Sequence, residues 1–211
     1  MKKIILSTSL ALLLTTGISH AEIKTPEQIK IEKAYQDKMD KAKKILDQAS
    51  EALSKDYEKY GVFHPKVADD YKTISEAYFT MGKLDESIEY ALRALKVEMK
   101  LQKEDDPALA KLYFDTGNKY YMHKQHPTAI LYMEKAAKIY ENSTEKESLV
   151  LADTYEGIAS TFMNLEDFNK SLAYAEKCLD IRKKKLKNED EALQRAQMNV
   201  EYLKKELKKE K

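Results

Sequence analysis

A fifteen-residue stretch that occurs three times decides the fold. It reads VADDYKTISEAYFTM at residues 67–81, LAKLYFDTGNKYYMH at 109–123 and LADTYEGIASTFMNL at 151–165, with a step of 42 residues between copies. Alanine is second in every copy, tyrosine is fifth, and the twelfth residue is aromatic. Within the first copy Ala68, Tyr71, Ile74 and Tyr78 are spaced by three and four residues. That spacing predicts an amphipathic helix.

A second set of small and apolar residues follows each copy at the same step. Its columns are Leu46, Ile88, Ile130 and Leu172; Ala49, Ala91, Met133 and Ala175; Ala52, Ala94, Ala136 and Cys178; and Leu53, Leu95, Ala137 and Leu179. Ile88, Ala91, Leu92 and Leu95 again have helical spacing. Each unit therefore predicts two antiparallel helices.

Capping residues predict where these helices begin and end. Met81-Gly82-Lys83-Leu84-Asp85 is the clearest turn inside a unit, and Gly82 suits a C-cap. Asp106-Pro107 predicts a helix start between units, His64-Pro65 lies at the same phase, and Thr25-Pro26-Glu27-Gln28 has the pattern of a capping box.

The column pattern resembles the tetratricopeptide repeat, and the 42-residue step with His64–Tyr71 is most similar to its kinesin-light-chain type. The resemblance covers residues 24–187 and implies an all-α, right-handed α-solenoid of helix–turn–helix repeats. The family's glycine at the first-helix contact is kept only as Gly117, and Ser75 and Ala159 replace it. Small residues still permit close approach of the helices, so the fold prediction is unaffected.

The predicted organisation has five parts after a leader. Residues 22–63 form a degenerate first helix pair, in which Ile29, Glu32 and Gln36 replace Tyr71, Ile74 and Tyr78. Residues 64–187 form three repeats, at about 64–105, 106–147 and 148–187, and residues 188–211 form a C-terminal capping helix. An apolar stripe in this last segment comprises Leu193, Ala196, Val200, Leu203 and Leu207. It fits a cap that solvates the end of the stack, with a coiled-coil dimer seam as the alternative.

Residues 1–21 have the pattern of a bacterial secretory signal peptide. Lys2 and Lys3 precede a mostly apolar run over 4–14, and Ser19-His20-Ala21 predicts cleavage after Ala21. The alternative is an uncleaved anchor, but the run is shorter than the roughly 20 residues that span a bilayer. We expect a periplasmic or secreted protein with no membrane span after cleavage.

Composition excludes several classes of function. The 37 basic and 36 acidic residues nearly cancel, which gives no support to nucleic-acid binding. A single cysteine excludes an internal disulfide framework and a cysteine-based zinc site. Glycine-rich phosphate loops and paired catalytic carboxylates are not found. We therefore expect no enzyme activity, no cofactor and no metal, although an enzyme with an unusual site stays a minor alternative.

Three features that could carry chemistry have simpler interpretations. His123 and His126 form an HxxH at a turn, where an ordinary turn is favoured over a metal site. Cys178 stands in an alanine column and is expected to be buried. The basic run over 182–187 is interpreted as a solvated face, with contact to an anionic partner as the alternative.

The resemblance implies a concave face that is made mainly by the first helix of each repeat and binds another protein or peptide. The candidate partner-binding residues are Lys72, Glu76, Phe79, Phe114, Asn118, Tyr121, Met122, Glu156 and Met163. Exposed aromatics and methionines suit an extended peptide or a helix. The alternative is that Phe79, Phe114 and Tyr121 pack between repeats. A clamp for an acidic chaperone tail is disfavoured, because the carboxylates of Glu76, Asp115 and Asp153 would repel it.

The sequence thus predicts an exported, non-enzymatic scaffold that binds a protein partner and is a monomer or weak homodimer. The alternative function is a self-associating structural envelope protein that dimerises through residues 193–207.

Overall fold

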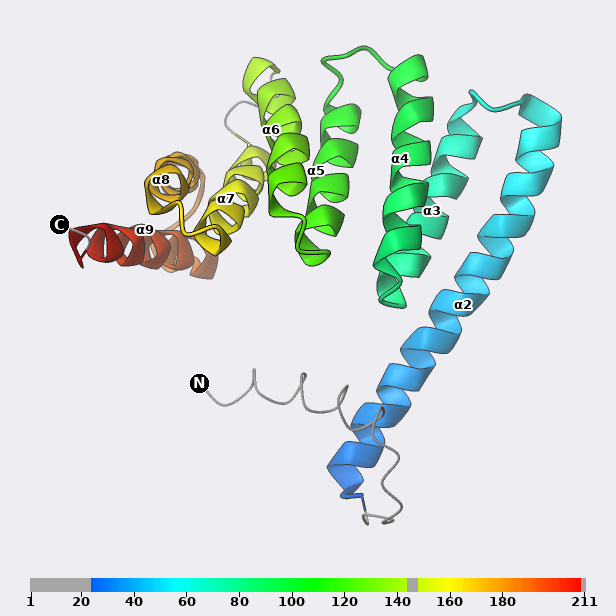
Figure 1. The fold of residues 1–211 in the computed structure, drawn as a ribbon, viewed down its shortest axis with the longest axis horizontal. Coiled ribbons are helices and arrows are strands. Elements are labelled where there is room, and N and C mark those ends of the chain that lie inside the picture. The colour runs from blue at the N-terminus through cyan, green and yellow to red at the C-terminus, as the bar shows by residue number, and fades with distance from the viewer. Residues whose placement is uncertain (1–23, 144–147, 210–211) are drawn as a thin grey trace. The chain divides into compact units, whose positions relative to one another are not determined.

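The structure, a computed structural model, describes residues 24–143 and 148–209, and every element in these ranges is an α-helix (Figure 1). The helices are α2 (Pro26–Tyr60), α3 (Pro65–Thr80), α4 (Leu84–Leu101), α5 (Pro107–Met122), α6 (His126–Asn142), α7 (Leu149–Asn164), α8 (Phe168–Lys185) and α9 (Glu191–Lys209). The predicted leader lies outside the described residues. The chain divides within α2, so that residues up to Asp37 form one unit and residues from Lys38 form another.

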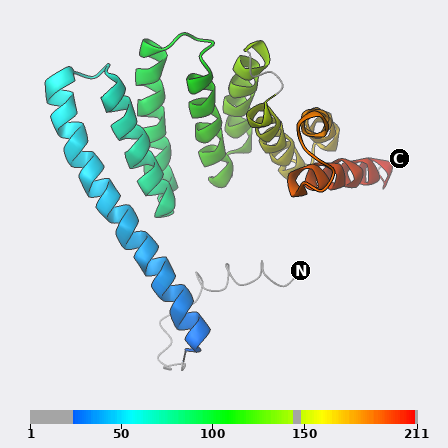
Figure 2. The same cartoon turned by 180° about the vertical axis from the view of Figure 1, so that it is seen from behind.

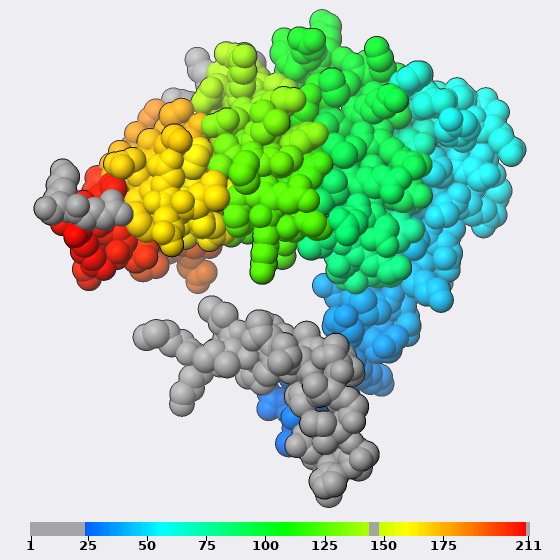
Figure 3. Space-filling view, in the orientation of Figure 1, coloured from blue at the N-terminus to red at the C-terminus, as the bar shows by residue number. Residues whose placement is uncertain are grey.

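Neighbouring helices of the second unit pack in pairs, as the prediction requires. α3 packs on α4, α5 on α6 and α7 on α8, while α4 contacts α5, α6 contacts α7 and α9 covers α8 (Figures 1 and 2). On the side that Figure 3 shows, the side chains of α3 to α9 form a continuous surface. The predicted all-helical solenoid is confirmed.

The helix ends follow the 42-residue step. Gly82 ends α3 with φ +74°, and the residues one and two steps later, Lys124 and Glu166, adopt the same left-handed conformation at +61° and +58°. Asp106 accepts a hydrogen bond from the Ala108 amide at 2.8 Å, and the Thr25 hydroxyl accepts one from the Gln28 amide at 3.2 Å. The capping predictions at these two helix starts are confirmed.

Within each repeat the two helices cross closely at a pair of small residues. In the first repeat the Ser75 and Ser87 hydroxyls donate to each other's backbone carbonyls at 2.7 and 2.8 Å. In the second, a β-carbon on Gly117 would lie 3.1 Å from the Ala129 carbonyl oxygen. In the third, Ser171 donates to the Ala159 carbonyl at 2.8 Å. Any of the three small residue types therefore suffices at this crossing, as predicted.

The predicted degenerate helix pair at residues 22–63 is not present, because residues 26–60 form one continuous helix. At the 42-residue step, Lys33 and Ile45 occupy the crossing positions held by Ser75 and Ser87, and Asp40 occupies the turn position of Gly82. A long and a β-branched side chain at the crossing keep two helices apart, and this part of the chain has no glycine or proline to break the helix. The hairpin therefore does not form.

The C-terminal helix caps the stack. Leu193, Ala196, Val200 and Leu203 are buried within the chain, and α9 packs against α8. The stripe is therefore covered within the chain, so these four side chains are not available to form a dimer seam.

Candidate partner-binding surface

On α3, the predicted binding residues are partly held by neighbouring helices. The Lys72 ammonium lies 2.8 Å from Glu98 and 2.7 Å from Asp69. Lys119 extends from α5 toward α3, where its Nζ lies 3.2 Å from a Glu76 oxygen and 4.8 Å from the centre of the Phe79 ring. Lys119 is itself buried, so it links the two repeats and partly covers Phe79.

On α5, the two aromatic candidates pack between repeats. A β-carbon on Gly157 of α7 would lie 3.2 Å from Phe114 Cε2, so the ring rests directly on that glycine. The Tyr121 hydroxyl accepts a hydrogen bond from Asn164 of α7 at 3.0 Å. Both rings are half-buried against the core. For Phe114 and Tyr121 this packing agrees with the alternative of inter-repeat contacts.

On α7, Glu156 belongs to an ion-pair network and does not stand free. Its carboxylate accepts hydrogen bonds from Arg182 of α8 at 2.7 Å and from Arg195 of α9 at 3.0 Å. Burial opposes ionisation of Glu156, but the two guanidinium groups outweigh it and hold the pKa of this carboxyl below its usual value of 4.5.

Arg182 is the centre of that network and corrects the interpretation of the basic run. Its side chain is 2% exposed, and it also pairs with Asp153 at 2.6 Å and donates to the Ala192 carbonyl at 3.2 Å. Burial disfavours the charged guanidinium, yet the hydrogen bonds that it donates to Glu156 and Asp153 raise the pKa of Arg182. Only the lysines of the run are solvated, while Arg182 fastens α9 to α7 and α8.

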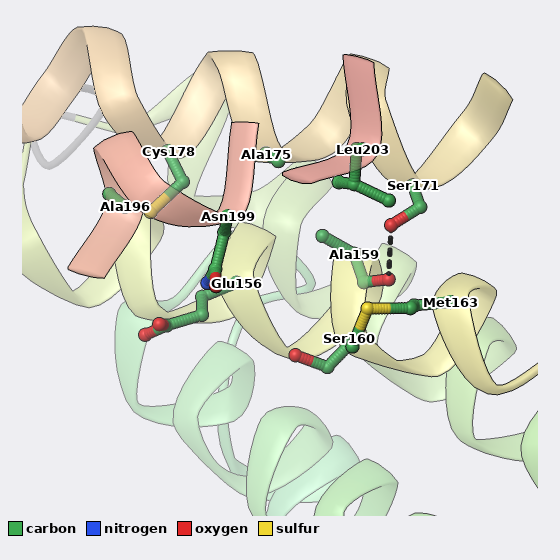
Figure 4. Close-up of a pocket in the computed structure, with 10 residues that line it drawn as sticks. All are labelled: Glu156, Ala159, Ser160, Met163, Ser171, Ala175, Cys178, Ala196, Asn199 and Leu203. Carbon is green, nitrogen blue, oxygen red and sulfur yellow. Dashed lines mark hydrogen bonds between the residues drawn. The ribbon is translucent and has the colours of Figure 1, made fainter. Parts of the chain in front are cut away.

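The exposed apolar candidates are methionines. Met122 and Met163 are 53% and 38% exposed, and Asn118 is half-buried on the same helix as Met122. Met163 lies with Glu156 and Ser160 beside a small cavity at the meeting point of three helices (Figure 4). The other residues that line this cavity are Ala159 of α7; Ser171, Ala175 and Cys178 of α8; and Ala196, Asn199 and Leu203 of α9. The cavity, of about 20 Å³, has room for about one water molecule, so it cannot hold an organic ligand.

The candidate surface continues onto α9, beyond the residues predicted from the sequence. Met198 and Tyr202 lie one 42-residue step after Glu156 and Ser160, and they are 61% and 49% exposed. The repeat step alone could have identified them, because the last segment keeps the phase of the repeats. We use the term first-helix face for the exposed side chains Met122, Met163, Met198 and Tyr202.

The chemically reactive side chains have structural surroundings. His123 pairs with Asp85 at 2.8 Å, whereas His126 packs beside the Tyr121 ring with 5.6 Å between ring centres. Cys178 is buried, and burial raises the pKa of its thiol to about 11. Among the described residues no group of three or more His, Cys, Asp or Glu is placed to hold a metal ion.

No helix in the described ranges has the length and apolar character needed to cross a membrane.

Two sequence models of the tetratricopeptide repeat match the chain, one over residues 67–142 and the other over 151–196, together more than half of its length. The chain belongs to the tetratricopeptide repeat (TPR) family. Among proteins of curated function, none matches the sequence significantly.

Solved structures share the TPR fold at low sequence identity. The kinesin-light-chain nearly identical TPR-like repeats of Podospora anserina match with a TM-score of 0.70 and 13% identity, covering 86% of this chain and 87% of that one. BtubC (BKLC) of P. vanneervenii matches with a TM-score of 0.61 and 15% identity, covering 82% and 84%. The apo form of RapI matches with a TM-score of 0.65 and 18% identity, covering 78% of this chain and 44% of RapI.

TPR repeats indicate a protein–protein interaction scaffold, and the family is generally non-enzymatic. For this chain the coarse function is therefore protein binding.

Proposed function

We propose that this TPR protein is an exported adaptor that binds a partner protein along the first-helix face. One observation carries the proposal: methionine and tyrosine side chains remain exposed on α5, α7 and α9, while the aromatic residues beside them are committed to packing between repeats. Flexible methionines adapt to an apolar partner surface, so they are suited to anchor a bound helix or extended peptide.

Charged groups of both signs are also present on the first helices of the repeats. Glu76 and Asp153 are exposed near the basic groups of Lys119 and Arg182. Such mixed charges contribute to specificity and association rate more than to affinity.

Export is the second part of the proposal, and it rests on the leader pattern of residues 1–21. The compartment would be the periplasm or the exterior of the cell. Mass spectrometry of the protein from the cytoplasm, periplasm and medium of a bacterial host tests it: a mature chain that begins at Glu22 in the periplasm or medium supports export, and a chain found only in the cytoplasm with Met1 intact contradicts it.

A photo-crosslinking amino acid tests the face directly. It is placed at Met122, or at the matched control Met99, which is 54% exposed on the second helix α4. A protein crosslinked from position 122 but not from 99, and lost when Met163→Glu is added, supports the proposal. Equal crosslinking from both positions contradicts it.

Self-association is the alternative function, and the buried stripe on α9 now restricts it to the exposed side of that helix. Light scattering of the chain and of a Met198→Lys, Tyr202→Lys variant separates the two. A dimer that becomes a monomer in the variant would favour self-association, and a monomer in both cases removes it.

A further inference from the structure

Each repeat contains a group of three aromatic rings that follows the 42-residue step. In the second repeat Tyr132 of α6 lies between Tyr113 and Tyr120 of α5, with ring centres 6.1 and 5.3 Å apart. The equivalent groups are Tyr71, Tyr78 and Tyr90 in the first repeat, and Tyr155, Phe162 and Tyr174 in the third.

A cation lies over two of these rings in the second and third repeats. Lys135 is 5.5 Å from the centre of the Tyr113 ring and 5.6 Å from that of Tyr132. Lys177 is 5.0 Å from Tyr155 and 5.3 Å from Tyr174. The chain therefore uses this pair of tyrosine faces to bind an ammonium group, at distances within the roughly 6 Å of a cation–π contact.

In the first repeat a cation lies over only one of the two equivalent rings. Arg93, one step before Lys135, lies 5.1 Å from the Tyr90 ring, and its guanidinium is also held by Glu89. Among the described residues no cation lies over the ring of Tyr71. Tyr71 instead borders a cleft next to α2.

The cleft lies where α2 packs less closely on α3 than α4 does on α5. Its volume is about 410 Å³, within the usual range for ligand sites, roughly 300–1,000 Å³. At the step of 42, Ser50 and Ser54 stand where α4 has Leu92 and Lys96, so short side chains leave the space open. The walls are Ser50, Leu53, Ser54, Tyr57 and Glu58 of α2, Tyr71 and Ile74 of α3, and Tyr90 of α4.

The acidic group that lines this cleft, Glu58, favours a cationic occupant. Asp70 is not one of the lining residues but directly precedes Tyr71, and its buried Oδ2 atom has no hydrogen-bond partner among the described residues. Burial and the nearby carboxylates of Asp56 and Asp69 raise the pKa of Asp70, and Lys66 only partly opposes them. Lys66 is itself placed over the Tyr60 ring at 5.2 Å.

We infer that the cleft between α2 and α3–α4 binds a lysine or arginine side chain of a protein partner, between the Tyr57, Tyr71 and Tyr90 rings and with Glu58 as counter-charge. The site is separate from the first-helix face. In this site the partner's cation would lie against tyrosine rings of the first repeat, as Lys135 and Lys177 do in the second and third repeats.

Titration of the full chain with blocked tetra-arginine and tetra-citrulline peptides tests this inference. Citrulline has nearly the shape of arginine but no charge. We expect the arginine peptide to bind at least about tenfold more tightly, with amide shifts in α2 and α3 observed by nuclear magnetic resonance. Absence of binding, equal binding of both peptides, or shifts confined to other helices would overturn the inference.

Substitutions locate the site. Tyr57→Ala and Glu58→Gln change solvent-exposed residues of α2, so the fold should persist, which circular dichroism checks. Each should weaken binding of the arginine peptide about fivefold. The matched controls Tyr202→Ala and Glu201→Gln on α9, and Met122→Glu on the first-helix face, should leave it unchanged. Equal losses in the controls would mean non-specific attraction and would refute the site.

Discussion

At the scale of single residues, the turn inside each repeat requires a left-handed backbone, yet only the first repeat has glycine there. Lys124 and Glu166 adopt φ values of +61° and +58° at the positions equivalent to Gly82. For residues with a β-carbon this conformation costs roughly 1–2 kcal/mol. The turns are therefore kept by the packing of the helices on either side.

Replacing these two residues with glycine should stabilise the protein. We expect Lys124→Gly and Glu166→Gly each to raise the free energy of unfolding by about 0.5–1 kcal/mol, because relief of backbone strain exceeds the added entropy of the unfolded chain. Urea denaturation measures the change. Gly82→Ala is the converse control and should destabilise by about 1 kcal/mol; a loss of stability in both glycine variants would contradict the interpretation.

The residue scale also shows what the sequence could predict. Ala68, Tyr71 and Cys178 are buried as their columns indicate, because burial in a repeat depends only on phase. The burial of Arg182 could not be predicted from its phase in the repeat. It depends on Asp153 and Glu156, which lie 29 and 26 residues away and contact Arg182 only after α7 and α8 pack. The same long-range contacts hold Glu156, one of the predicted binding residues, in the ion-pair network.

At the scale of elements, Arg182 connects three helices, so its removal should loosen the C-terminal end of the stack. We expect Arg182→Ala to lower the free energy of unfolding by about 3 kcal/mol, because a buried ion pair is broken and its partners lose their counter-charge. Chemical denaturation measures this. Lys183→Ala, an exposed neighbour, is the control and should change stability by less than about 0.5 kcal/mol. Equal effects would mean that the network has no special role.

The pH dependence of this network follows from Glu156. Its pKa is lower in the folded protein than in the unfolded chain, so the unfolded state takes up protons first on acidification. The stabilisation is therefore complete above pH 4.5 and is lost as the pH falls through the lowered folded-state pKa.

Glu156→Gln should remove this contribution. At pH 7 the variant should be less stable than the original chain by about 1.5 kcal/mol, and the difference should shrink as the pH falls through the lowered pKa of Glu156. Thermal unfolding at a series of pH values measures it. A difference that stays constant with pH would show that the ionised carboxylate is not what stabilises the α7–α9 junction.

The elements also mark where prediction from sequence failed. Helix spacing is the same whether two helices fold back on each other or continue as one, so the apolar columns of Leu46 and Ala49 could not distinguish the two for residues 26–60. The informative residues were Lys33 and Ile45 at the crossing, since Lys124 and Glu166 show that the turn forms without glycine. Their sizes, and not the periodicity, determine that α2 stays continuous.

At the scale of the whole molecule, a repeat stack depends on contacts between neighbours, so its two ends should contribute unequally. α9 buries Leu193, Ala196, Val200 and Leu203 against the stack, whereas residues up to Asp37 form a separate unit. In such a stack stability is approximately the sum of repeat and interface terms. Removing an end therefore costs only the interface that it makes.

Two truncations test this asymmetry. Deleting residues 1–37 should change the free energy of unfolding of the remaining unit by less than about 0.5 kcal/mol, because it removes no buried apolar side chain of that unit. Deleting residues 189–211 should lower it by more than about 3 kcal/mol, since it uncovers α8 and leaves Arg182 without the Ala192 carbonyl. Urea denaturation followed by circular dichroism gives both values. If the N-terminal deletion proved as costly as the C-terminal one, the two ends would contribute equally and the predicted asymmetry would be wrong.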